Sequence, residues 1–345
     1  TKGSAESVTE VKHELKDLYK WQIYTTDINA KYIAVRPYGG DLDMLEMAFK
    51  DKDGNLVTPQ SVTPPEAAPL FDEQELVPDE PTYMTDFYFD EIYHVRTAYE
   101  NIHQIEPYEI THPPLGKIIL ACGIEMFGMN PFGWRFMGTL TGVLMLPVMY
   151  IFAKMLLKKT KYAAFATILF AADFMHFAQT RIGTIDSYSI LWIMLMYLFM
   201  YLFTQSNFNK EKLSKSLVPL ALSGLFFGIG AATKWLCMYA GAGLAVIFFM
   251  TLYKRYREYR FAKESKLPDY KPIVQSFKWN VLIMLAWCVL FFIVVPLIIY
   301  FASYYPYTIV TQGNAYDFSR ILENQSYMLN YHSLLDPEKV HPFAS

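Results

Sequence analysis

The sequence predicts a mainly α-helical, polytopic membrane module preceded by a partial β-sandwich. The chain is 53% hydrophobic and only 18% charged, which is a low charge content for a soluble protein. Its charges lie in blocks between apolar runs, and from about Trp134 onwards these runs follow one another with short loops. Because lipid offers no hydrogen bonds, spanning helices are the structure that satisfies the backbone of such runs.

Residues 1–85 are predicted to form a polar first domain, a partial β-sandwich with a linker. Lys31–Pro37 and Met44–Phe49 are rich in strand-forming residues, and Gly39-Gly40 between them is typical of a turn. Asp51–Asn55 is predicted to be a second turn, of the Asp-Gly type.

The stretch from residue 30 to residue 55 resembles the later half of a discoidin-like β-sandwich, of the galactose-binding jelly-roll family. A fragment of this length does not bury a complete core by itself. Ser61–Pro81 is rich in proline and acidic residues, so it is predicted to be a linker or an irregular connection.

Residues 86–345 are predicted to form the membrane domain. Several of its apolar segments are shorter than the roughly 20 residues of a simple crossing, so we expect irregular helices or shifted ends. The six predicted spans are Trp134–Leu157, Tyr162–Phe177, Tyr188–Phe203, Leu217–Ala232, Leu236–Tyr253 and Trp279–Phe301.

Basic residues follow the first, third and fifth predicted spans. If every span crosses once, these three loops lie on one side, which the positive-inside rule makes cytoplasmic. We therefore expect a multi-pass cell membrane protein whose acidic pair Asp90–Glu91 and remaining site candidates lie on the extracytoplasmic side. The basic residues of the loops are Lys158, Lys159 and Lys161, then Lys210, Lys212 and Lys215, then Lys254, Arg255, Arg257, Arg260, Lys263 and Lys266.

Asp90 and Glu91 are the first candidates for chemistry. Adjacent acids at a helix start can be a solvated pair that the helix dipole stabilises. On the outer membrane face, Asp90 could instead act as a general base, with Glu91 orienting a basic neighbour.

The segment His112–Lys117, with the sequence HPPLGK, is a more specific signal. Its two prolines favour an extended entry, after which a helix can begin. Gly116–Gly128 is apolar enough to form a short helix in the membrane interface. Lys117 is expected either to snorkel toward the headgroups or to contact a lipid phosphate.

Further candidates are charged residues at the outer ends of the spans. Arg135 opens the first span, Arg181 and Asp186 bracket the RIGTID loop, and Lys234 ends the fourth span. Basic residues on this side run against the positive-inside bias, and ionisable groups at span ends are candidates for function. Pairing of a cation with Asp186 or Asp173 is the structural alternative.

The order of these motifs resembles the protein O-mannosyltransferase family, polyprenyl-phosphate-dependent glycosyltransferases of the GT-C class. The bacterial members, which use a phospholipid carrier, are the most similar. The resemblance runs from Tyr88 to Ser345, and its motifs are FDE, THPPLGK, NPFGWR, FMHFAQTRIGTIDSY, ATKW, PLIIYFASYYPY and YHSLLDPEKVHPFAS.

This resemblance implies an inverting transfer of a hexose, with mannose expected, from a polyprenyl-phosphate lipid to Ser or Thr hydroxyls of an acceptor protein. It implies that Asp90-Glu91 is the catalytic motif and that Arg135 matches the family arginine at the start of the following span. His112, Lys117, Arg181, Asp186 and Lys234 are then candidates for binding the donor phosphate or substrate.

Two departures from the family pattern concern the extent of the chain. Family members have a span before the acidic pair, where this chain has the polar first domain, and they continue into further spans after the motif that ends here at Ser345. We therefore expect the membrane domain to be an excerpt, truncated at its C-terminus.

Neither a cofactor nor a metal is expected, because the sequence has no glycine-rich phosphate loop and no clear cluster of metal ligands. The net charge of −3 gives no global basic field for nucleic acid. One alternative is a GT-C transferase that glycosylates a lipid or a cell-wall glycan. Alternatives of another class are a membrane transporter, although no internal repeat is visible, and a sugar-binding membrane protein.

Overall fold

The computed structural model describes residues 10–14, 20–38, 44, 46–82, 84–310 and 316–334. The chain divides into two compact units, Thr1–Ile92 and Tyr93–Ser345. Regular structure in the first unit is sparse, whereas the second unit is built from helices.

The described part of the first unit contains two short 3-10 helices, η1 (Pro65–Phe71) and η2 (Gln74–Leu76). Both lie in the predicted linker. Gln74 Nε2 donates hydrogen bonds to Glu46 Oε1 (2.7 Å) and to the carbonyl oxygen of Met47 (2.8 Å), which ties η2 to the preceding segment.

The predicted β-sandwich is not supported. The described residues of Lys31–Pro37 and Met44–Phe49 form no strand, and the first unit's described residues contain a single isolated bridge, between Lys50 and Leu56. Gly39-Gly40 lies outside the described residues. Strands are stable when they pair and bury one face, and no described residue from 10 to 82 is buried.

The predicted turn at Asp51–Asn55 is confirmed. Asp51 Oδ1 accepts hydrogen bonds from the backbone N–H groups of Asp53 (2.9 Å) and Asn55 (2.8 Å). Gly54 takes a φ of +85°, which favours glycine at this position.

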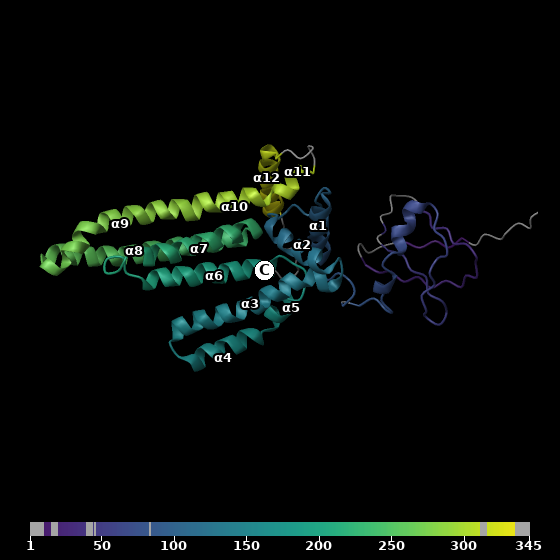
Figure 1. Ribbon diagram of the computed structural model, residues 1–345, viewed down its shortest axis with the longest axis horizontal. Coiled ribbons are helices and arrows are strands. Elements are labelled where there is room, and N and C mark those ends of the chain that lie inside the picture. Colours follow the sequence, from purple (N-terminus) through teal and green to yellow (C-terminus); the bar gives the residue numbers. More distant parts are fainter. Residues whose placement is uncertain are drawn as a thin grey trace, which may run out of the picture. The chain divides into compact units, whose positions relative to one another are not determined.

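The second unit contains a bundle of long helices and several shorter helices (Figure 1). The shorter helices are α1 (Glu91–His103), α2 (Leu115–Phe127), α4 (Thr160–Ala171), α5 (Phe174–Gln179), α11 (Tyr305–Ile309) and α12 (Phe318–Leu334). The long ones are α3 (Pro131–Leu157), α6 (Asp186–Gln205), α7 (Ser214–Thr233), α8 (Leu236–Ser265) and the composite of η3 (Pro268–Tyr270), α9 (Lys271–Val289), the π-helical η4 (Leu290–Val294) and α10 (Val295–Ser303).

Five helical segments of the described residues are long and apolar enough to cross a membrane: α3, α6, α7, α8 and the composite Pro268–Ser303. They match five of the six predicted spans. The sixth prediction, Tyr162–Phe177, is wrong as a single span, because the segment divides into α4 and α5. Asp173 makes the division: its side chain accepts a hydrogen bond from the backbone N–H of His176 and caps α5.

The predicted short helix after the two prolines is confirmed as α2, which begins at Leu115 directly after Pro114. At 13 residues it is too short to span a bilayer.

The two ends of the bundle differ in charge. Figure 1 shows the α3–α4, α6–α7 and α8–α9 connections at one end, as the loop pattern predicts, and α1, α2, α5, α11 and α12 at the other. The three basic clusters lie at this end, the first two in and beside the α3–α4 and α6–α7 connections and the third mostly in the last turns of α8. We call the opposite end the polar-site end, because the polar groups described below gather there.

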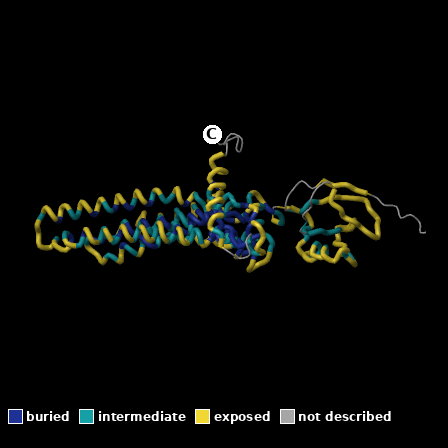
Figure 2. The backbone as a smooth tube through the Cα atoms, turned by 90° about the horizontal axis from the view of Figure 1, so that it is seen from above, coloured by how far each residue is buried: buried dark blue, intermediate teal, exposed yellow. Residues whose placement is uncertain are grey.

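Burial is also uneven along the bundle. Figure 2 shows buried residues concentrated at the polar-site end and exposed positions alternating along the long helices. Only 11% of the most apolar 18-residue stretch of Pro268–Ser303 is buried. Apolar helices with this much outward-facing surface are typical of spans that lipid surrounds.

Two helices of the bundle approach each other very closely at Gly224. A Cβ atom there would lie 2.4 Å from the carbonyl oxygen of Phe291, which belongs to the π-helical turn η4. Small residues allow membrane helices to pack backbone against backbone. Glycine is therefore required at this position for α7 to contact η4.

Gly224→Ala is expected to destabilise the protein by about 1–3 kcal/mol, as overpacking usually does. The measurement is thermal unfolding of the purified protein in detergent. Val218→Leu on the same helix is the control, because Val218 is 56% exposed. An unchanged melting temperature for Gly224→Ala would show that α7 and η4 do not pack this closely.

Candidate functional site

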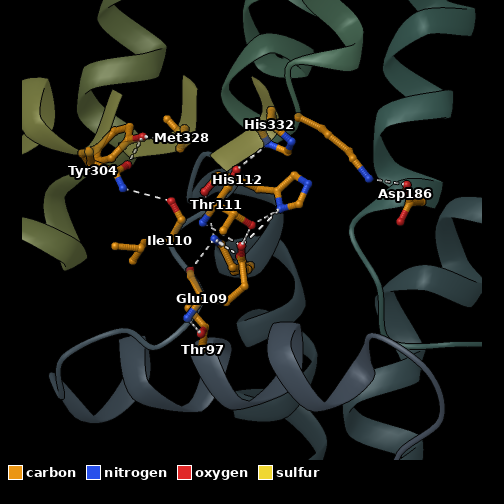
Figure 3. A network of polar contacts seen from close by, with 12 residues as sticks. Thr97, Glu109, Ile110, Thr111, His112, Asp186, Tyr304, Met328 and His332 are labelled. Atoms are coloured by element: carbon orange, nitrogen blue, oxygen red, sulfur yellow. Dashed lines mark hydrogen bonds and ion pairs between the residues drawn. The ribbon is translucent and has the colours of Figure 1, made fainter. Parts of the chain in front are cut away.

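A network of buried polar groups lies at the polar-site end (Figure 3). Its central residues lie in the loop between α1 and α2, and side chains of α1 hold this loop in place. Glu100 Oε2 accepts a hydrogen bond from the backbone N–H of Tyr108 (2.6 Å), and Thr97 Oγ1 accepts one from the backbone N–H of Glu109 (2.9 Å). These contacts turn the Glu109 side chain into the interior, where only 8% of it is exposed.

Lys117 and Glu109 form a buried ion pair. Lys117 Nζ donates to Glu109 Oε2 (2.5 Å) and to the carbonyl oxygens of Glu109 (2.8 Å) and His112 (2.9 Å). The lysine side chain is 2% exposed, and its three donors have three acceptors. This geometry favours neither snorkelling nor contact with a lipid phosphate, and it supports a structural role for Lys117.

The ionisation states follow from these contacts. Burial by itself would raise the pKa of Glu109, but the charge of Lys117 and the hydrogen bond from His112 outweigh it and hold the pKa well below its usual value. Burial lowers the pKa of His94 to about 3, against the opposing effect of the Glu109 carboxylate. At neutral pH the cluster therefore contains an ionised carboxylate, an ammonium group and a neutral imidazole at His94.

The partners of His112 assign its tautomer. His112 Nδ1 lies 3.2 Å from Glu109 Oε1 and 3.0 Å from Thr111 Oγ1. The ionised carboxylate only accepts, and the Thr111 hydroxyl donates to the same Glu109 oxygen. His112 Nδ1 must therefore carry a proton, and Nε2 is the nitrogen that remains for another ligand.

His94, Glu109 and His112 also form a donor set of the kind that binds zinc, with ligand atoms within 4.8 Å of one another. Among the described residues, His94 Nδ1 has no hydrogen-bond partner. The ammonium group of Lys117 already neutralises the carboxylate of this set, and a second cation beside it would be repelled. The expected independence from metals stays a prediction.

Two further charged candidates meet beside this cluster. A Cβ on Gly116 would lie 2.8 Å from Ile185 Cγ2 and 3.1 Å from Thr233 Cγ2, so the residues just before Asp186 and Lys234 both pack on the start of α2. Lys234 Nζ donates to Asp186 Oδ1 at 2.6 Å, and both side chains are partly exposed. Figure 3 shows the His112 ring between Glu109 and Asp186.

Helix α12 lies over the same region. Asn324 Nδ2 donates to the carbonyl oxygen of Ile110 (2.9 Å), while Asn324 Oδ1 accepts from the Tyr304 hydroxyl (2.8 Å). At the end of α12, His332 Nε2 lies 3.0 Å from the carbonyl oxygen of Thr111. These bonds connect α12 to the loop that carries Glu109 and His112.

The other predicted site residues lie elsewhere at this end. Arg181 is exposed, and its guanidinium lies 3.5 Å from the centre of the Phe177 ring. Arg135 is half-buried in the first turns of α3, with its guanidinium 5.9 Å from the centre of the Trp134 ring.

Asp90 and Glu91 stand at the start of α1, in the first unit of the chain. Glu91 is fully buried, and its Oε2 accepts a hydrogen bond from the backbone N–H of Tyr88 at 2.6 Å. Asp90 directly precedes the helix and is half-buried. An acid at a helix start is the arrangement that the helix dipole stabilises, and the catalytic roles of the pair stay predictions.

Sequence reasoning missed Glu109, His94 and His332 as members of the site. Glu109 stands in a polar loop with nothing to show that it is buried. A usable signal was its position three residues before His112 and eight before Lys117, since a buried cation needs a nearby anion.

The chain matches a known family over most of the membrane domain. The family described as dolichyl-phosphate-mannose-protein mannosyltransferase matches residues 124–310. The chain belongs to this family. The matched stretch includes Arg135, Arg181, Asp186 and Lys234, whereas Asp90 and the Glu109 cluster precede it.

Three mycobacterial and corynebacterial proteins are similar to the chain. Each is named polyprenol-phosphate-mannose–protein mannosyltransferase. Those of Mycobacterium tuberculosis and Mycolicibacterium smegmatis are 26% identical over 164 and 189 residues, covering 46% and 48% of this chain and 31% and 35% of the relatives. That of Corynebacterium glutamicum is 27% identical over 185 residues, covering 48% of this chain and 36% of the relative. The aligned part thus spans about a third of these relatives.

Lys117→Met is expected to destabilise the protein by about 3–5 kcal/mol, because it leaves Glu109 buried and charged without its partner. The measurement is thermal unfolding in detergent at neutral pH. Adding Glu109→Gln to the same variant should recover part of the loss, since the uncompensated charge is then gone.

Lys215→Met is the matched control. Lys215 pairs with Glu211 at 3.2 Å on the surface, with the lysine side chain 66% exposed, and such pairs contribute little. If Lys117→Met and Lys215→Met lowered the melting temperature equally, the burial of the Lys117–Glu109 pair would not explain the loss of stability.

Proposed function

We propose that this chain is part of an enzyme that transfers mannose, with inversion, from polyprenyl-phosphate mannose to Ser or Thr hydroxyls of proteins. The family membership carries the proposal. We place the reaction at the polar-site end, on the extracytoplasmic face. The location of the three basic loops at the opposite end supports this orientation.

The charges at the polar-site end suit a lipid-phosphate donor. The leaving group is a phosphate that is already ionised, so it needs cations more than it needs a general acid. Lys234 is half-buried at the end of α7 and Arg135 lies in the first turns of α3, and we assign both to the donor phosphate. Arginine suits this role because its planar fork binds phosphate through two hydrogen bonds.

The acceptor hydroxyl must lose a proton as it attacks the sugar. We propose that Asp90 accepts this proton as the general base and that Glu91 orients a basic neighbour. The general base and the cations together make a metal-independent transfer feasible. The alternative function as a sugar-binding membrane protein rested on the predicted sandwich. The described residues of the first unit form no such sandwich, so this alternative loses its main support.

Asp90→Asn is expected to abolish mannosyl transfer and to leave the protein folded in the membrane, because the amide cannot accept the hydroxyl proton. The measurement is transfer of radiolabelled mannose from mannosyl-phosphoryl-polyprenol to a Ser/Thr peptide, in membranes that carry the full-length protein. Asp79→Asn is the control, since Asp79 is an exposed acid of the same unit. Full activity of Asp90→Asn would refute the general-base role.

Lys234→Gln is expected to raise the KM for the donor by about one to two orders of magnitude, in line with about 1.5–3 kcal/mol for a hydrogen bond to a charged group. The same transfer assay measures it, with donor and acceptor varied separately.

The pairing of Lys234 with Asp186 provides the control. Asp186→Asn removes the partner and keeps the cation, so donor affinity should persist. If both variants instead lose thermal stability and keep the donor KM, the ion pair is structural and Lys234 does not hold the phosphate.

A further inference from the structure

A second group of charged side chains lies at the end of the bundle opposite the polar site, and the proposed function does not use it. It comes from two segments, residues 206–215 between and beside α6 and α7, and residues 254–266 at the end of α8. We call these two segments together the basic surface. Its cations are Lys210, Lys212, Lys215, Lys254, Arg255, Arg257, Arg260, Lys263 and Lys266.

Polar contacts around a buried arginine join the two segments. Arg255 is buried, and its guanidinium donates to the carbonyl oxygen of Ser206 (2.7 Å) and to Glu258 Oε1 (2.5 Å). The side-chain amides of Asn207 and Asn209 both donate to Glu258 Oε2, at 3.1 Å and 3.0 Å. Asn209 also donates to the carbonyl oxygen of Arg255 (3.1 Å). The loop after α6 is therefore fixed against α8, and the exposed cations of both segments belong to one surface.

Each acid of the basic surface already has a cation as its partner. The three pairs are Glu211–Lys215 (3.2 Å), Arg255–Glu258 (2.5 Å) and Arg260–Glu264 (2.8 Å). The remaining cations are exposed and take part in none of the ion pairs between described residues. They are Lys210, Lys212, Lys254, Arg257, Lys263 and Lys266. The connection to α9 then adds one exposed acid, Asp269, and one exposed cation, Lys271, which leave the balance unchanged. The surface therefore carries an excess of positive charge.

The basic surface directly adjoins the apolar part of α8. This helix has 30 residues, so it is about 45 Å long, whereas the hydrocarbon layer of a bilayer is about 30 Å thick. Its last turns therefore extend beyond the hydrocarbon layer. Tyr253 and Tyr256 are exposed where the apolar run ends, and exposed tyrosines at the end of a span are typical of the headgroup layer. Lys254 and Arg257, which follow them in the chain, are then at headgroup depth.

We propose that the basic surface binds the headgroups of anionic phospholipids. This inference goes beyond the proposed function and does not depend on it. Lysine and arginine clusters next to a span attract anionic lipids, and arginine also binds phosphate oxygens directly. A lipid fits this position better than a soluble anion, because its chains can lie along the apolar side chains that precede the cations. Phe249 and Met250, about one turn before Lys254, are 60% and 67% exposed.

Phosphatidylglycerol is the probe, with phosphatidylcholine as the lipid without net charge. The full-length protein in detergent is titrated with each lipid, and native mass spectrometry counts the bound molecules. The variant Lys210→Gln/Lys254→Gln/Arg257→Gln is expected to bind phosphatidylglycerol about tenfold or more weakly, since each cation near the headgroups contributes about fivefold. Phosphatidylcholine binding and the melting temperature should not change, because all three side chains are exposed. Wild-type affinity for phosphatidylglycerol in this variant would overturn the proposal.

Lys158→Gln/Lys159→Gln/Lys161→Gln is the matched control. It removes the same charge at the same end of the bundle, but from the α3–α4 connection and the start of α4, which do not belong to the basic surface. All three lysines are exposed. The control should lose much less affinity for phosphatidylglycerol than the first variant. Equal losses would show that net charge alone attracts the lipid, and the assignment of a site would be wrong.

A variant without any change of charge tests whether the two segments act together. Asn207→Ala/Asn209→Ala removes the amide bonds to Glu258 and to the Arg255 carbonyl oxygen and keeps every cation. Weaker binding of phosphatidylglycerol, with unchanged binding of phosphatidylcholine, is expected because the loop is then no longer fixed against α8. Unchanged binding of phosphatidylglycerol would show that the segments do not form one site.

Soluble anions distinguish a lipid site from other uses of the same charge. Inorganic phosphate and a polyglutamate peptide are added separately to the complex of the protein with phosphatidylglycerol. Neither should displace the lipid at equal concentration, since neither has chains that contact the apolar surface of α8. Displacement by phosphate would make this a site for free phosphate, and displacement by the peptide would make it a surface for acidic proteins. Either result would overturn the assignment to lipid.

Discussion

The buried ion pair between Lys117 and Glu109 is the interaction on which the site depends. Removing two charges from water is costly, and their attraction offsets that cost only with good geometry and further hydrogen bonds. Here each condition is met, because Lys117 has three acceptors and Glu109 also accepts from the backbone N–H of Thr111. The pair therefore fixes the turn between α1 and α2, and with it the orientation of His112.

The same turn brings the spans together at one end of the bundle. Gly116 follows the two prolines of the turn and has no side chain, so Ile185 and Thr233 can pack directly against the start of α2. Asp186 and Lys234 come next in the chain, and their contact at 2.6 Å follows from that packing. Charged groups from segments about 50 residues apart in sequence thus meet at one level of the bundle.

This arrangement agrees with chemistry on a lipid phosphate. The reactive part of such a donor lies at the membrane surface, while its chain lies in the apolar layer, so the protein needs polar groups at one end of apolar helices. A transporter would place ionisable groups near the middle of the membrane. The described charged residues of this bundle instead gather at the helix ends, with lysines and arginines in the loops at one end and the mixed acid, base and imidazole groups at the other.

Five of the six spans, and the gathering of the basic clusters at one end of the bundle, could be predicted from the sequence, because apolar length and charge pattern are local properties. The exception, Tyr162–Phe177, arose because a single capping residue, Asp173, outweighed the apolar composition around it. The sandwich prediction is not supported by the described residues, because strand-forming residues need pairing partners and a resemblance over one short stretch does not supply them.

The sequence by itself determined the family, the membrane character and the residue types of the site, because motif order and hydrophobicity are properties of the sequence alone. Only the tertiary structure decided which charges are partners. It turned Lys117 from a candidate phosphate ligand into the partner of Glu109, and it brought His332 beside His112 across more than 200 residues. The reason is that a charge in a low-dielectric interior is stabilised by whichever opposite charge folding brings within a few ångströms, and that distance is unrelated to sequence separation.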